Sequence, residues 1–442
     1  MRSLYNLSIH LLQLVFSIGR FFNSKINQGY KGRQNWRHHL INFKKNNPGK
    51  LIWFHCASLG EFEMARPVID ELNANPLEDA KILITFFSPS GYELRKNFKD
   101  ADGVMYMPLD TPKNAIDFVT IAQPFISIFV KYEFWLNHLE QLKIQGSKVL
   151  LINGLFRKEQ SFFQWWGAMF REALKNFDIL FLQNKNSQKL IHSLDVYPHD
   201  SKYEMLRGDT KQGTSASIRV PTNRNINTIV TGDLRYDRVM TISKTAKQFP
   251  QLNLFIKDSF VIIGGSTWPE EEWILQQCLN SLGDKIKLII APHDVSEKHL
   301  KQIENRFSKN KLKRFTEMKP EDNPEIILVD TVGHLSSLYQ CGTVALVGGG
   351  FAGALHNIIE PAVFGIPVFF GYKHSKFPEA DYFKKNKIGI SIHNGFNFTE
   401  HMKELLANPK KLETIKHKTP MVFKSHLGGT HQVYYKIVGY WK

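Results

Sequence analysis

Residues 345–371, ALVGGGFAGALHNIIEPAVFGIPVFFG, carry the strongest indication of the fold. The apolar run 344–347 stops at three glycines, 348–350, and a second apolar run begins at Pro367. Between them lies a short helical pattern, so the order is strand, glycine loop, helix and strand. Glycine lets the backbone approach a ligand, and the N–H groups at a helix start attract an anion. We therefore expect a nucleotide site at the carboxyl end of a parallel sheet.

Two series of alternating strand and helix patterns indicate an α/β protein with parallel sheets. Expected strands in the first series are 51–55, 81–86, 125–130, 148–152, 179–182 and 228–231, and in the second 260–263, 287–290, 325–329, 344–347 and 368–370. We expect two Rossmann-like domains, residues 40–240 and 255–442, that face each other across a cleft. The last helix is expected to belong either to the second domain or, by returning, to the first. The polar segment 211–227 is predicted to be an exposed loop.

Composition narrows the class of protein. Of the 442 residues, 43% are hydrophobic and 22% charged, which is typical of a globular protein and excludes a disordered one. Three scattered cysteines have no metal-ligand spacing and predict no disulfide framework, which favours a reducing compartment. The net charge of +16 favours an anionic partner: nucleic acid, anionic lipid or a phosphorylated substrate.

The N-terminus favours lipid. Residues 4–19, LYNLSIHLLQLVFSIG, are apolar at helical spacing and are followed by Arg20, Lys25, Lys31, Arg33, Trp36 and Arg37. This run is near the lower limit for a membrane span and lacks the cleavage site of a signal peptide. We expect residues 1–22 to form an anchor helix at an anionic membrane surface, either spanning it or lying flat. The alternative is a first helix that packs on its own domain.

A glutamate follows the first predicted strand. The strand 51–55 runs into HCASLGE, in which residues 58–60 form a tight turn and Glu61 falls at the start of a helix. A carboxylate there is favourable against the helix dipole, which is the structural explanation of Glu61. Its place at the carboxyl end of a strand gives a functional one, since a carboxylate at such an edge can take a proton from a hydroxyl.

Seven motifs in series resemble the 3-deoxy-D-manno-oct-2-ulosonic acid (Kdo) transferases of Gram-negative lipopolysaccharide synthesis. They are HCASLGE, KYEFW, INGLFR, TGDLRYD, GGST, DTVGHL and HNIIEPAVFGIPV, and the resemblance covers nearly the whole chain. It implies a GT-B glycosyltransferase that takes Kdo from CMP-Kdo and transfers it to the lipid A precursor (lipid IVA). It also implies a place on the cytoplasmic face of the inner membrane, whose anionic surface fits the positive charge.

The resemblance assigns roles to three residues of the first domain. Glu61 matches the general base of an inverting displacement, and Glu133 and Arg235 match the groups that stabilise the transition state. Arg235 stands where the family usually has lysine, so a planar fork replaces a point charge. From the residues alone, Glu133 reads equally as a loop residue that caps or pairs, and Arg235 as an ordinary ion-pair partner of Asp233 or Asp237.

For CMP, the resemblance points to three loops of the second domain. They contain Pro292 and His293; Val332, Gly333 and His334; and Asn357, Ile358, Ile359 and Glu360. We expect helix N–H groups to meet the phosphate and Glu360 the ribose. His293 stands where the family usually has arginine, which predicts a phosphate or carboxylate contact that is weaker, pH-dependent or supplied by another residue. We expect no cofactor beyond the donor substrate and no required metal, because CMP carries a single phosphate that N–H groups can bind.

Other functions fit parts of the pattern. A GT-B transferase that uses a UDP-sugar, or a sugar-nucleotide epimerase, would have the same sheets and glycine loop, although an epimerase needs no membrane anchor. A non-catalytic membrane- or nucleic-acid-binding protein is a further alternative. The basic residues are dispersed without a stacking platform of aromatic residues, so we expect no nucleic-acid partner.

Overall fold

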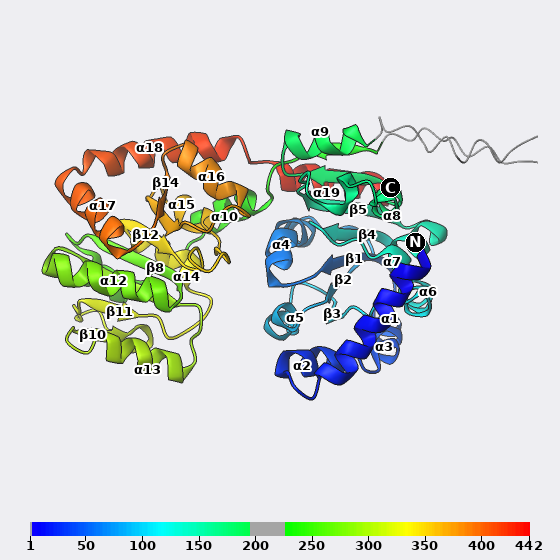
Figure 1. The fold of residues 1–442 in the computed structure, drawn as a ribbon, viewed down its shortest axis with the longest axis horizontal. Coiled ribbons are helices and arrows are strands. Elements are labelled where there is room, and N and C mark those ends of the chain that lie inside the picture. The colour runs from blue at the N-terminus through cyan, green and yellow to red at the C-terminus, as the bar shows by residue number, and fades with distance from the viewer. Residues whose placement is uncertain (1, 195–225) are drawn as a thin grey trace, which may run out of the picture. The chain divides into compact units, whose positions relative to one another are not determined.

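The computed structural model describes residues 2–194 and 226–442, which fall into two compact units. Unit 1 consists of Met1–Arg235 and Leu427–Lys442, and unit 2 of Tyr236–His426 (Figure 1). Residues 211–225 of the predicted polar loop lie outside the described residues. The chain thus leaves unit 1 at Arg235 and returns to it for its last helix.

Unit 1 is built on a seven-stranded sheet in the order β3-β2-β1-β4-β5-β6-β7, in which every pair of neighbours is parallel. Its strands are β1 (Lys50–Cys56), β2 (Ala80–Phe86), β3 (Gly103–Tyr106), β4 (Pro124–Val130), β5 (Lys148–Gly154), β6 (Ile179–Leu182) and β7 (Thr228–Val230). The central strands read as continuous apolar runs because both faces of the sheet are covered.

Alternate residues of each strand face opposite helical layers. Trp53 packs with α3 (Trp36–Asn46), α6 (Pro112–Ala122), α7 (Leu136–Gln145) and α8 (Ala168–Leu174). Phe54 packs on the other face with α4 (Leu59–Ala74) and with α19 (Gly429–Trp441), the returning helix. Two smaller helices, α5 (Pro89–Arg95) and α9 (Lys185–Ser193), follow β2 and β6.

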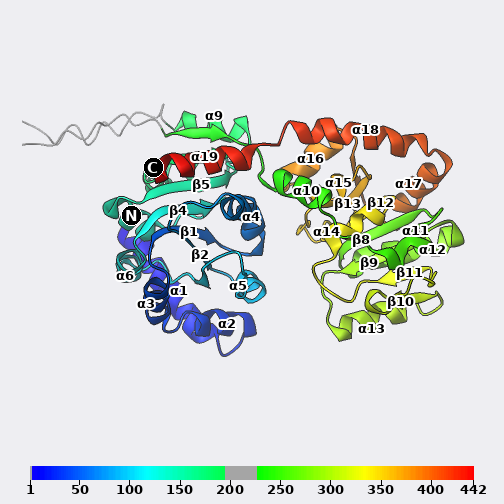
Figure 2. The ribbon, with the colours of Figure 1, turned by 180° about the vertical axis from the view of Figure 1, so that it is seen from behind.

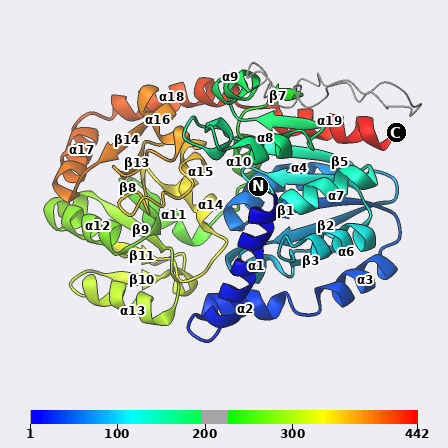
Figure 3. The ribbon, with the colours of Figure 1, turned by 45° about the vertical axis from the view of Figure 1, so that its right-hand side comes forward.

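The first two helices, α1 (Arg2–Gly19) and α2 (Ser24–Gly32), pack against each other on unit 1 (Figure 3). A buried carboxylate holds α1 in place, because Asp110 accepts the hydroxyl of Tyr5 at 2.6 Å. Asp110 also accepts the N–H groups of Asn137 and His138 at 2.9 Å each, which satisfies the first turn of α7. None of the described helices is both long and apolar enough to cross a membrane.

Unit 2 has a second seven-stranded sheet, in the order β10-β11-β9-β8-β12-β13-β14, and its neighbours are again all parallel. Its strands are β8 (Val261–Thr267), β9 (Lys287–Pro292), β10 (Leu312–Arg314), β11 (Ile326–Leu328), β12 (Val344–Val347), β13 (Val368–Gly371) and β14 (Gly389–Ile392). The predicted fold class, an α/β protein with two parallel sheets in separate units, is therefore confirmed.

Helices cover both faces of this second sheet. One face packs against α12 (Pro269–Leu282), α13 (Glu297–Arg306) and α17 (Gly395–Ala407), and α12 and α17 lie side by side (Figure 2). The other face packs against α10 (Arg235–Lys244), α11 (Asn253–Ile256), α14 (Leu335–Leu338), α15 (Ile359–Ala362), α16 (Pro378–Lys385) and α18 (Lys410–Lys424).

The glycine loop after β12 is fixed by close approach of two backbones. A Cβ on Gly350 would lie 2.5 Å from the backbone N of Gly371 at the end of β13, and a Cβ on Gly371 would lie 2.5 Å from the carbonyl carbon of Gly350. Gly349 has a φ of +81°, in the left-handed region that glycine adopts without strain. The run of glycines is therefore required by packing inside unit 2, whatever ligand the loop meets.

We expect Gly350→Ala to destabilise unit 2 by about 3 kcal/mol, because the methyl group has no room against backbone atoms that cannot move aside. Urea denaturation, followed by tryptophan fluorescence, measures the change in the free energy of unfolding. The matched control is Gly439→Ala in α19, where an added Cβ meets no atom within 4 Å. That variant should be neutral or slightly more stable. Equal stability of wild type and Gly350→Ala would contradict the packing argument.

Candidate active site

The loops after β1 and β4 bring two glutamates together in unit 1. Glu61 lies in the first turn of α4, and its carboxylate accepts the hydroxyl of Ser58, the N-cap residue of that helix. Glu133 follows β4, and its Oε2 accepts the indole N–H of Trp135 at 2.7 Å. Burial raises the pKa of the Cys56 thiol well above its ordinary value, and the charges of Glu61 and Glu133 raise it further. Both carboxylates therefore flank the carboxyl end of β1.

A buried histidine that was not predicted from the sequence supports Glu133. His55 is the penultimate residue of β1 and has no solvent exposure. Its Nδ1 lies 2.9 Å from the hydroxyl of Thr85, and its Nε2 lies 3.0 Å from the indole nitrogen of Trp135 and 3.5 Å from Glu133 Oε2. The ring thus packs beneath the loop that carries Glu133 and Trp135. Histidine in a motif is a weak signal by itself, and only the fold shows this contact.

Arg235 makes a buried ion pair with the residue two positions before it. Its Nη2 lies 2.6 Å from Asp233 Oδ2, and its backbone N–H and Nε also donate to this carboxylate. Although burial raises the pKa of Asp233, the charge and hydrogen bonds of Arg235, with a smaller contribution from Lys131, hold it below the ordinary value. The ion-pair interpretation of Arg235 therefore describes its contacts.

An asparagine links this segment to the glutamate helix. Asn153, at the end of β5, accepts the N–H of Leu234 at 3.0 Å and donates to the carbonyl of Met64 in α4 at 3.3 Å. It is buried and has a φ of +54°, a conformation that asparagine tolerates better than most residues. Asn153 thereby fixes α4, which carries Glu61, against the loop before Arg235.

In unit 2, the predicted nucleotide residues form two groups. Glu360 belongs to the first: its Oε2 accepts the hydroxyl of Ser336 at 2.7 Å, and its Oε1 accepts the side-chain N–H of Asn357 at 3.0 Å. Arg238 of α10 belongs to this group, because burial lowers the pKa of its guanidinium and the charge of Glu360 raises it. Neither Ser336 nor Arg238 was predicted from the sequence, since each lies far from Glu360 along the chain.

The second group is aromatic. His293, which follows β9, stacks on Trp268 with ring centroids 5.5 Å apart and lies 4.7 Å from the ring of His356. The indole N–H of Trp268 is 3.2 Å from His356 Nε2. Burial, with a smaller contribution from His293, lowers the pKa of His356 to about 4. His356 is therefore neutral at pH 7, and its ring forms part of an apolar wall beside the exposed His293.

The remaining predicted residues are separate from these rings. Val332 is 72% exposed, and Gly333, which has a φ of +90°, is exposed as well. His334 packs against the rings of Phe249 and Phe315. Pro292, Ile358 and Ile359 are buried.

The helix expected to bind phosphate is a single turn. α15 spans Ile359–Ala362, and the N–H of Ile359 donates to the side chain of Asn357 at 3.2 Å. The dipole of a helix grows from the alignment of many peptide groups, so one turn offers little to an anion. The apolar spacing after the glycine loop predicted a helix, but Gly365 and Pro367 stop it early.

A buried glutamate positions the glycine loop. Glu271, in the first turn of α12, is 1% exposed. One of its oxygens accepts the N–H of Gly349 at 2.9 Å, and the other accepts the N–H of Trp268 at 3.0 Å. Burial raises the pKa of Glu271 to about 7, although these hydrogen bonds oppose the shift. The same carboxyl group therefore ties the glycine loop to the residue on which His293 stacks.

Comparison with known proteins identifies relatives of both units. Residues 34–209 match the family described as 3-deoxy-D-manno-octulosonic-acid transferase (kdotransferase). A 3-deoxy-D-manno-octulosonic acid transferase of Aquifex aeolicus is 26% identical over 375 residues, which cover 84% of this chain and 89% of the relative. A probable mitochondrial enzyme of the same name from Arabidopsis thaliana is 28% identical over 406 residues, 86% of this chain and 82% of the relative.

Among solved structures, the UDP-GlcNAc 2-epimerase of Neisseria meningitidis bound to UDP-GlcNAc has a TM-score of 0.52. Its sequence is 16% identical, and the match covers 83% of this chain and 94% of that chain. At this identity the likeness concerns the fold alone.

We expect the ionisation of Glu271 to make unit 2 less stable as the pH rises. The folded carboxyl keeps its proton to about pH 7, whereas in the unfolded chain it loses it near pH 4.3. The stabilisation is complete below the unfolded value and is lost as the pH rises through the folded one. Relative to Glu271→Gln, the wild type should lose about 2–3 kcal/mol of unfolding free energy between about pH 5 and pH 8.

Urea denaturation at several pH values measures this difference. Glu400→Gln in α17 removes an exposed glutamate that pairs with Lys403, and should leave the pH dependence unchanged. A difference between wild type and Glu271→Gln that stays constant with pH would show that Glu271 is ionised throughout.

Proposed function

We propose that the chain is a 3-deoxy-D-manno-octulosonic acid (Kdo) transferase that transfers Kdo from CMP-Kdo to the lipid A precursor (lipid IVA), because residues 34–209 match that family and transferases of that name are 26–28% identical over most of the chain. The product would enter the inner core of lipopolysaccharide. The observation that carries the proposal is the paired placement of Glu61 and Glu133 at the carboxyl end of β1, within the segment that matches the family.

In the proposed reaction, Glu61 is the general base. It accepts the proton of an acceptor hydroxyl while the hydroxyl oxygen bonds to the anomeric carbon of Kdo. The bond from that carbon to the phosphate oxygen breaks, and CMP leaves with the electron pair. Attack opposite to CMP inverts the configuration at the carbon. The hydrogen bond from Ser58 orients the carboxylate of Glu61, and its partly exposed position lets a hydroxyl reach it.

Glu133 and Arg235 are proposed to act on the charges of the transition state. Positive charge develops at the anomeric carbon, where an anionic Glu133 would stabilise it. Negative charge develops on the departing phosphate, where the guanidinium of Arg235 would stabilise it. The ion pair with Asp233 holds the guanidinium of Arg235 in position. The planar guanidinium can donate two parallel hydrogen bonds, which a lysine ammonium cannot.

Unit 2 is proposed to hold the donor. Glu360, set by Ser336 and Asn357, has the acceptor oxygens that ribose hydroxyls need. The stacked Trp268 and His293 offer a flat surface on which a planar ring can pack. We propose that no metal ion is required, because the donor carries one phosphate.

An apolar face on α1 supports association with a membrane surface. Leu4, Leu7, Leu11, Leu14, Val15 and Ile18 are each 53–69% exposed on this helix. The opposite side of α1 is held on unit 1 by Tyr5. Residues 1–60 contain nine Lys and Arg and neither Asp nor Glu. A docked helix with an apolar outer face and cations beside it fits a helix that lies in the interface of an anionic membrane.

Incubation of the protein with CMP-Kdo and lipid IVA should yield a Kdo-modified lipid and CMP, detected by mass spectrometry. Glu61→Gln should lower kcat by about 10²–10⁴-fold, the usual value of a general base. The matched control is Glu71→Gln, a glutamate of the same helix whose contacts are with Asn75 and His431, and it should retain activity.

Transfer from UDP-sugars in place of CMP-Kdo would contradict the proposed donor. Undiminished turnover by a folded Glu61→Gln variant would instead remove Glu61 as the base and leave the donor assignment standing.

We expect Leu11→Glu to weaken binding to vesicles that contain anionic phospholipid by about tenfold or more, because one leucine side chain can no longer be buried in the interface. Co-sedimentation with vesicles measures the bound fraction. Ile144→Glu on α7 is the matched control, since Ile144 is 72% exposed on another helix of unit 1. Equal losses in the two variants would indicate an effect of net charge alone.

A further inference from the structure

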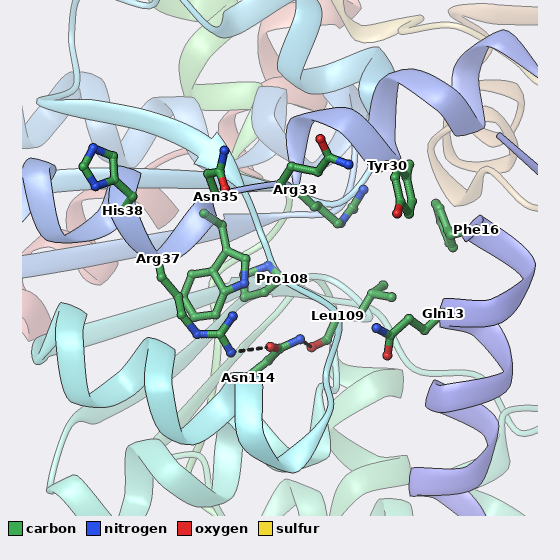
Figure 4. Close-up of a pocket in the computed structure, with 12 residues that line it drawn as sticks. Gln13, Phe16, Tyr30, Arg33, Asn35, Arg37, His38, Pro108, Leu109 and Asn114 are labelled. Carbon is green, nitrogen blue, oxygen red and sulfur yellow. Dashed lines mark hydrogen bonds between the residues drawn. The ribbon is translucent and has the colours of Figure 1, made fainter.

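A pocket of about 450 Å³ lies beneath α1 in unit 1 (Figure 4). Gln13 and Phe16 of α1 line it, together with Arg33 and Gln34 after α2, Arg37 of α3 and Asn114 of α6. We propose that this pocket binds a phosphate group of the lipid acceptor, while the acyl chains follow the apolar face of α1. The proposal rests on the proposed function, because it names where that acceptor is held.

Arg33 is the first reason to expect an anion. Its Nε donates to the carbonyl of Met107 at 2.9 Å, its Nη1 to the carbonyl of Gly29 at 2.8 Å, and its Nη2 to the carbonyl of Phe87. These three bonds use three of the five N–H donors of a guanidinium. Burial lowers the pKa of Arg33 to about 10, which leaves it charged at pH 7.

The surroundings of Arg33 compensate its charge only in part. The rings of Phe16, Phe87 and Tyr106 lie 5.5, 4.7 and 5.0 Å from the guanidinium carbon. Within the described part of the chain, no carboxylate lies within ion-pair distance of Arg33. A bound anion stabilises a partly buried cation of this kind more than a fully hydrated one. Its charge-assisted hydrogen bond replaces hydration that the cation has lost on burial.

The second cation of the pocket is already paired. Arg37 lies 2.6 Å from Asp117 Oδ2, and its Nη2 donates to Asn114 at 2.9 Å, as the dashed line in Figure 4 shows. Asn114 in turn donates to the carbonyl of Leu109 at 2.9 Å. This side of the pocket is therefore rigid and polar, and Arg33 is the group whose charge faces the cavity without a carboxylate partner.

The pocket is linked to Glu133, the second of the two candidate glutamates, by a chain of contacts. Phe87, whose carbonyl binds Arg33, has its ring centroid 5.0 Å from that of Trp135, and Trp135 donates to Glu133. Phe87 follows β2 and Met107 follows β3, so pocket and glutamates share the carboxyl edge of neighbouring strands. From β1 to β3 this edge spans about 10 Å, roughly the length of a disaccharide. One glycolipid could place a phosphate in the pocket and a hydroxyl near Glu61.

The apolar residues next to the pocket favour a phosphate that belongs to a lipid over a free anion in solution. Phe16 lines the cavity, and the same helix exposes Leu11, Leu14 and Val15. Residues 1–37, which include α1, α2 and the pocket-lining arginines, contain six Lys and Arg and neither Asp nor Glu. A molecule with a phosphate and long apolar chains satisfies both features together.

The test uses a charge placed at the pocket without disturbing Arg33. Gln34 lines the pocket and is exposed, so Gln34→Glu should fold and repel a phosphate. Gln28→Glu, on α2 but outside the pocket, is the matched control because it changes the net charge equally. We expect Gln34→Glu to raise the KM for lipid IVA about tenfold, with kcat and the KM for CMP-Kdo unchanged. Gln28→Glu should match the wild type.

The same measurements with enzymatically dephosphorylated lipid IVA separate phosphate binding from other effects. This acceptor should bind the wild type about tenfold more weakly, and Gln34→Glu should have no further effect. If Gln34→Glu and Gln28→Glu behave alike, or if dephosphorylation changes nothing, the pocket does not bind the acceptor phosphate.

Direct binding of detergent-dispersed lipid IVA, measured without CMP-Kdo, distinguishes failure of this proposal from failure of the proposed function. Phosphate-dependent binding that Gln34→Glu weakens, in a protein that transfers no Kdo, would support the pocket and contradict the function. Competition by excess phosphatidylglycerol as effective as that by lipid IVA would overturn the assignment to the acceptor, since the pocket would then be a general site for lipid head groups.

Discussion

Parallel pairing of the strands governs where chemistry can occur in each unit. All neighbouring strands run in the same direction, so every loop that follows a strand emerges at one edge. In unit 1 this edge collects Glu61, Glu133 and Arg235, and in unit 2 it collects His293 and the glycine loop. The helices between the strands cover both faces of each sheet. A site at that edge therefore needs only short loops, which a packed sheet holds in place.

The sequence predicted the interior of the sheets better than their margins. Each strand that it missed, β3, β10 and β14, lies at an edge of its sheet. Central strands are covered on both faces and read as apolar runs, such as VALV in β12. An edge strand makes fewer contacts, and LKR in β10 has no apolar pattern to detect. The missed strands thus reflect the weak constraint that an edge places on residue type.

Candidate site residues were predictable where a local motif carries them. Glu61 follows a strand and starts a helix, so its position at the edge could be inferred from spacing. Arg238, Trp268 and Glu271 could not be inferred, because their importance comes from partners that approach only in the folded sheet. The prediction for α15 was wrong in the opposite direction. Apolar spacing indicated a helix that could bind phosphate, but the helix is a single turn because glycine and proline follow it closely.

The return of α19 to unit 1 has a consequence for biosynthesis. Val433, Ile437 and Trp441 belong to the same apolar cluster as Phe54 and the helix that carries Glu61. A ribosome makes these residues after the whole of unit 2, so the first unit stays without this cover while the second is already able to fold. The part of the chain that is translated first is thereby completed last. A nascent chain that stops before residue 427 would leave one face of its first sheet open to chaperones or to aggregation.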